Sequence, residues 1–152
     1  MKIFFLLSVI ALSSFSALAR QKGRECADTV NELRMLVGNS DFPTSWIETG
    51  GNDGMPLTMT ISEKSGQLFL DFNKKDKGMF IQATGTICKD GNKYVSNVKG
   101  SDIEWGPGAD GFIRGLIGNG DAKVTIELPY TNQMEVKISK GFLGADLKFG
   151  VK

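Results

Sequence analysis

The 152-residue sequence contains no histidine, and this absence removes several classes of site. Nucleophilic catalysis by Ser-His-Asp or Cys-His groups needs an imidazole as general base. Most zinc and copper sites also use imidazole ligands, and two cysteines are too few to replace them. Carboxylate-pair chemistry survives in principle, but Asp102, Glu104 and Asp110 cluster in a loop-like segment where solvation is the usual role. We therefore expect no catalytic residues, no metal site and no cofactor.

Concentrated charge and long apolar runs are also scarce. The formal net charge is +1, and like charges never occur four or more in a row. Nucleic-acid binding needs a concentrated positive field, and an anionic membrane surface is a poor partner for a neutral protein. The longest apolar run, residues 3–12, is too short to cross a bilayer of about 30 Å as a helix. We expect neither nucleic-acid binding nor a membrane span in the mature chain.

The apolar run belongs to a predicted signal peptide over residues 1–19. Lys2 supplies the preceding positive charge, and Ala17 and Ala19 have the spacing of a cleavage site. A retained anchor or a buried helix is the alternative. Cleavage would leave residues 20–152 as one domain, long enough to bury a core. The short signal and the absence of N-glycosylation sequons favour a bacterial periplasmic or secreted location.

Cys26 and Cys88 are the only cysteines. A lone pair in an exported chain is normally a disulfide. The alternatives are two buried thiols or a redox pair. A redox pair would normally have C-x-x-C spacing, which Cys26 and Cys88 do not have. We expect the disulfide.

One amphipathic helix is predicted over residues 25–37. Its apolar residues, from Cys26 to Val37, recur at spacings of three and four and form a single stripe. Gly38 ends the helix. Because Cys26 lies on the stripe, a bond to Cys88 would fix the buried face of this helix to the sheet.

From residue 57 onward the apolar period becomes two, the pattern of strands with one buried face. The connections contain Gly, Asn and Asp, which is typical of hairpin turns. Residues 79–88 are predicted as one strand that ends at Cys88. We predict a mainly β fold: an antiparallel meander of about eight or nine strands forming an up-and-down barrel or a strongly curved sheet. The helix would pack on its outside or across one end.

Trp46 and Trp105 are the main candidates for ligand binding. Both lie at the ends of predicted strands beside long loops, where aromatic rings could line the entrance of a barrel. The alternative is that both rings fill the core. Phe112 and Arg114, on a predicted strand at 112–118, complete the candidate set. Arg114 would anchor a ligand on the inner face, although the alternation slightly favours the outer face.

Two functions fit these features. The first is an exported, non-enzymatic binding module that holds a small apolar or amphipathic molecule. The second is a protein–protein interaction module, such as a secreted inhibitor or an envelope assembly factor, with a filled barrel. An outer-membrane barrel fits less well, because most predicted strands are shorter than the roughly 9–11 residues such strands need. The size of any void inside the sheet would discriminate between the first two.

Overall fold

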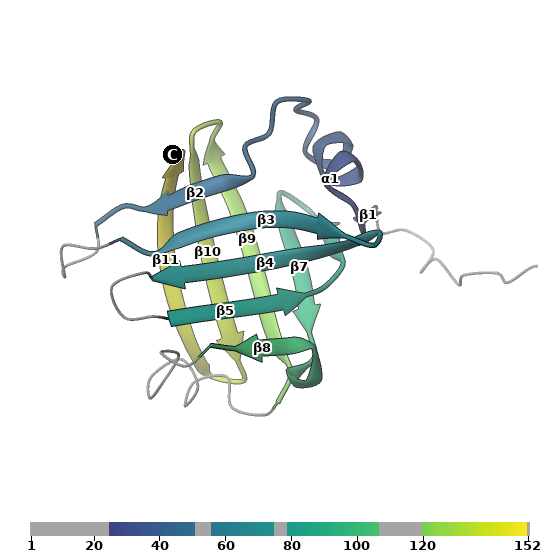
Figure 1. Ribbon diagram of the computed structural model, residues 1–152. Helices are drawn as coiled ribbons and strands as arrows, with labels where there is room; N and C mark the ends of the chain where they lie inside the picture. Colours follow the sequence, from purple (N-terminus) through teal and green to yellow (C-terminus); the bar gives the residue numbers. More distant parts are fainter. Residues whose placement is uncertain (1–24, 51–55, 75–78, 107–119, 152) are drawn as a thin grey trace, which may run out of the picture.

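A computed structural model describes residues 25–50, 56–74, 79–106 and 120–151 (Figure 1). Over these residues, eleven strands form one antiparallel sheet and one α-helix lies beside it. The prediction of a mainly β, antiparallel fold with one N-terminal helix is confirmed, whereas the predicted number of strands was too low. The strands are β1 (Cys26–Ala27), β2 (Ser45–Glu48), β3 (Thr58–Lys64), β4 (Gln67–Lys74), β5 (Met79–Thr84), β6 (Ile87–Asp90), β7 (Lys93–Val98), β8 (Ile103–Trp105), β9 (Ala122–Tyr130), β10 (Gln133–Lys140) and β11 (Leu143–Val151).

The helix α1 (Val30–Val37) is shorter than predicted, because a capping motif sets its start. The Glu32 N–H donates to Thr29 Oγ1 at 3.2 Å, so Thr29 is the N-cap. Gly38, with a φ of 74°, ends the helix as predicted. The prediction that Cys26 lies on the helix is therefore wrong, since Cys26 belongs to β1.

The predicted disulfide between Cys26 and Cys88 is confirmed. The two residues lie directly opposite each other on β1 and β6, with their Cα atoms 4.0 Å apart. The Lys89 N–H donates to the Glu25 carbonyl at 2.8 Å. The cysteines thus form a non-hydrogen-bonded pair, in which cross-strand side chains approach most closely. Because disulfides persist in oxidising compartments, the bond indicates an exported environment.

The order of strands in the sheet is β1-β6-β7-β9-β10-β11-β2-β3-β4-β5-β8. β5 and β6 lie near opposite ends of this order, yet only Gly85 and Thr86 separate them along the chain. The two ends of the sheet must therefore come close together, so the sheet is strongly curved. In Figure 1, β3, β4 and β5 cross in front of β9, β10 and β11 at a steep angle. The single strand predicted at 79–88 is two strands, because the chain changes partners at Gly85.

The core lies between two halves of this curved sheet, one that contains β3, β4 and β5 and one that contains β9, β10 and β11. The period-two pattern is confirmed on the long strands: Leu68, Leu70 and Phe72 of β4 are buried, as are Met134 and Val136 of β10. These side chains belong to one continuous apolar cluster.

The helix α1 covers the part of this cluster beside β1 and β3 (Figure 1). It contributes the buried Leu33 to the core. The Val30 N–H at its first turn donates to Glu63 Oε2 of β3 at 3.0 Å, which ties the helix to the sheet. No helix in the described segments is long and apolar enough to cross a membrane.

Candidate functional site

The structure places Trp46 in the core. Its side chain is fully buried, and its indole N–H donates to the Pro43 carbonyl at 3.0 Å. Its ring lies 5.6 Å from that of Phe42, centroid to centroid, at an interplanar angle of 48°. A ring whose polar atom is satisfied inside the protein fills space and has no donor left for a ligand. A role of Trp46 in binding stays a prediction that its surroundings do not favour.

Trp105 is not on a strand next to that of Trp46. Trp105 ends β8, which pairs with β5, whereas Trp46 belongs to β2, between β3 and β11. Phe112 and Arg114 lie outside the described residues, as does the predicted signal peptide at 1–19.

Between the two halves of the sheet, a cavity of about 30 Å³ remains. Its lining is apolar and comes from both halves, with Phe72 and Ile81 on one side and Val124 and Ile138 on the other. A volume of this order holds about one or two water molecules, whereas small-molecule sites usually measure about 300–1,000 Å³. The described core is therefore packed.

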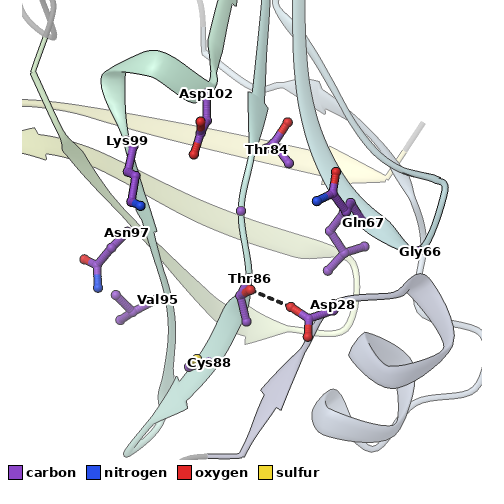
Figure 2. Close-up of a pocket in the computed structure, with 12 residues that line it drawn as sticks. Asp28, Gly66, Gln67, Thr84, Thr86, Cys88, Val95, Asn97, Lys99 and Asp102 are labelled. Atoms are coloured by element: carbon purple, nitrogen blue, oxygen red, sulfur yellow. Dashed lines mark hydrogen bonds between the residues drawn. The ribbon is translucent and has the colours of Figure 1, made fainter. Parts of the chain in front are cut away.

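A larger cavity, of about 560 Å³, opens at the surface where the chain that joins β5 to β6 separates from the chain that joins β7 to β8 (Figure 2). We call it the outer cleft. Gly66 and Leu68 lie on its β4 side and Val95 on its β7 side, while Gly85 comes from the link between β5 and β6 and Cys88 from β6. The remaining lining residues are polar: Asp28, Gln67, Thr84, Thr86, Asn97, Lys99 and Asp102.

The outer cleft results from the unequal lengths of two neighbouring chain segments, one between β5 and β6 and the other between β7 and β8. Cys88 pairs with Val95 in β6–β7, and Ala83 pairs with Ile103 in β5–β8. Between these pairs, one chain has four residues, 84–87, and the other has seven, 96–102. The extra residues include a 3₁₀ turn. The two chains therefore separate here, as at a large β-bulge.

Separation leaves backbone hydrogen-bonding groups facing the cleft. Because Cys26 and Cys88 are a non-hydrogen-bonded pair, the N–H and C=O of Cys88 point to the other side, toward Val95. These groups alternate in direction along a strand, so those of Asn97 point the same way as those of Val95. The next pair in register would be Asn97 with Thr86, but the ladder ends at Val95. Asn97 therefore has no partner strand on this side among the described residues.

Charges of both signs lie in the outer cleft. Lys99 supplies one cation, and Asp28 and Asp102 supply two carboxylates. The Thr86 hydroxyl donates to Asp28, and Ser101 Oγ donates to Asp102 at 3.0 Å. Over the described ranges, no group of three or more potential ligands could hold a metal ion. The lining is suited to hydrogen bonding.

A buried polar group lies behind the bend of the cleft wall. Ser96 is 1% exposed, and its Oγ has no hydrogen-bond partner among the described residues. A Cβ atom added to Gly85 would lie 2.5 Å from this oxygen. The bend therefore favours glycine at position 85, because a larger residue would displace the Ser96 side chain.

Sequence reasoning did not find the outer cleft. Its one local signal is the glycine at position 85, inside the segment predicted as one strand, because the alternation of 79–88 continues in phase through Ile87. The cleft and the interior cavity differ in polarity, and their volumes are about 560 and 30 Å³. No protein-family model, curated protein or solved structure matches the chain.

Proposed function

We propose that the protein is an exported, non-enzymatic binding protein that recognises another protein at its outer surface. The observation that carries this proposal is the packed interior, where the cavity of about 30 Å³ is roughly a tenth of the smallest usual ligand site. A filled sheet is a rigid scaffold, and such scaffolds present binding residues on surface segments.

The chemistry of the chain supports a binding role. The sequence has no imidazole to act as general base. The outer cleft contains hydroxyls, amides, a lysine and two aspartates, and the described lining has no histidine or free thiol to serve as the usual base or nucleophile. The disulfide supports function outside the reducing cytosol.

Binding of a small apolar molecule inside the sheet is the second candidate. It is favoured by the wholly apolar lining of the interior cavity. A ligand of ordinary size would have to displace several core side chains, because the cavity would need to expand about tenfold. Such displacement opposes the close packing of protein interiors.

Native mass spectrometry of the protein, purified from its own compartment without detergent, tests the proposal. We expect the mass of residues 20–152 less two hydrogens, alone or together with a protein partner. A bound small molecule that is released only on denaturation would contradict the proposal and support the second candidate. Denatured samples of the same preparation are the control.

A further inference from the structure

We infer that the outer cleft binds an extended peptide segment of the partner, which pairs with the free side of β7 beside Asn97. This inference rests on the proposed function, because it names the site and the chemistry by which the partner would be recognised. It starts from the backbone groups that the separated strands leave unpaired.

The free side of β7 is a short template for strand addition. Ser96 and Val98 direct their backbone groups to β9, where they pair with Val124 and Ala122. Asn97 directs its N–H and C=O to the cleft, as its alternation with these residues requires. An added strand satisfies such groups through main-chain hydrogen bonds, which depend little on the sequence of the peptide.

The lining complements the polar backbone of a peptide. Hydroxyls of Thr84 and Thr86 and amides of Gln67 and Asn97 can donate to or accept from peptide groups. None of the described lining residues is aromatic, so these residues offer no stacking surface of the kind that holds nucleobases. Its volume, about 560 Å³, lies within the range of ligand sites. Because its charges have both signs, an uncharged segment is the best match.

The cleft is preformed, which lowers the entropic cost of binding. On its β6 side, the Cys26–Cys88 disulfide joins β6 to β1. At the bend, the Gly85 N–H donates to the Leu68 carbonyl at 3.3 Å. Asp28 accepts a hydrogen bond from Thr86, and Figure 2 shows this contact across the lower part of the cleft. The walls are therefore held by bonds of the protein itself.

Titration of the ¹⁵N-labelled mature protein with the capped peptide acetyl-Thr-Val-Thr-Val-amide tests the inference by NMR. This probe is uncharged and prefers the extended conformation. We expect the largest amide shifts at Thr86, Asn97 and Lys99. The same peptide N-methylated at alternate residues should bind about tenfold more weakly or worse, because it lacks the donors that strand pairing requires.

Two substitutions separate the backbone of position 97 from its side chain. Asn97→Pro removes the N–H that faces the cleft together with the side-chain amide, and an unpaired strand side tolerates proline. We expect it to weaken binding about tenfold. Asn97→Ala keeps the N–H and should stay within about threefold of the native affinity. If the proline variant does not fold, the N-methylated peptide makes the same comparison on the native protein.

The outcomes distinguish this inference from the proposed function. Equal binding of both peptides, shifts confined to another surface, or no shifts at millimolar peptide would overturn the peptide site and leave recognition elsewhere on the surface intact. A small molecule found inside the native protein would overturn the proposed function itself. Shifts at the cleft that are lost with the N-methylated peptide and with Asn97→Pro would support the inference.

Discussion

Replacing both cysteines with serine should destabilise the protein by about 4 kcal/mol. The bond joins residues separated by 62 positions, Cys26 on β1 and Cys88 on β6. In the chain-entropy model, a loop of this length removes roughly 14 cal/mol/K from the unfolded chain, which is about 4 kcal/mol at 25 °C. Serine adds little further cost, because Cys26 is exposed and Cys88 is partly exposed. The loss would be a large share of the roughly 5–15 kcal/mol that stabilises an ordinary domain.

Urea unfolding of the native and Cys26→Ser/Cys88→Ser proteins measures this difference, provided that both unfold in two states. The native protein treated with a reductant is the matched control and should lose a similar amount. A loss below about 1 kcal/mol in both samples would refute the loop-entropy reasoning.

Three further predictions concern the core, the cleft wall and a surface ion pair. Trp46→Ala should cost about 3–5 kcal/mol, measured by urea unfolding, because it empties a fully buried site; a loss below about 1 kcal/mol would remove Trp46 from the core. Gly85→Ala should cost about 1–3 kcal/mol, because its Cβ meets Ser96 Oγ. The cost should shrink in a Ser96→Ala background, and an unchanged cost would disprove this contact. Lys93 Nζ lies 2.7 Å from Glu127 Oε1, and this hydrogen bond and the charge of Glu127 raise the pKa of Lys93 above 10.5. The stability that the pair contributes is therefore full below pH 10.5 and is lost as the pH rises through the higher pKa of the folded state. The difference in the free energy of unfolding between the native protein and Lys93→Gln should vanish in strong alkali. A difference that persists there would mean that the ion pair is not its source.

The features predicted well from the sequence are those that depend on neighbouring residues, or those for which the sequence allows only one arrangement. Alternation along single strands identified the buried faces of β4 and β10, because a side-chain period of two is a local property. With two cysteines, only one disulfide could form within the chain. Gly38 marked the end of α1, because glycine readily adopts the positive φ found there.

The features that were missed depend on competing local signals or on pairing between distant segments. The Thr29–Glu32 cap starts α1 later than the apolar stripe suggested. The break at Gly85 depends on contact with Ser96, eleven positions away along the chain. The outer cleft depends on two registers, 83 with 103 and 88 with 95, that no single strand encodes. The candidate site at Trp46 rested on its nearness to loops, which does not determine whether a ring points into the core.

The joining of β5 to β6 also bears on resistance to aggregation. β5 and β6 are consecutive in the chain, and each has only a short strand on its outer side: β1, with two residues, lies beyond β6, and β8, with three, lies beyond β5. Sheets self-associate through long, flat edges, and short terminal strands offer few backbone groups for this. The free groups of Asn97 lie in a cleft within the sheet, where a single peptide can enter more easily than the edge of a second sheet. A site for strand addition inside the sheet is thus compatible with terminal strands, β1 and β8, that are too short to favour polymerisation.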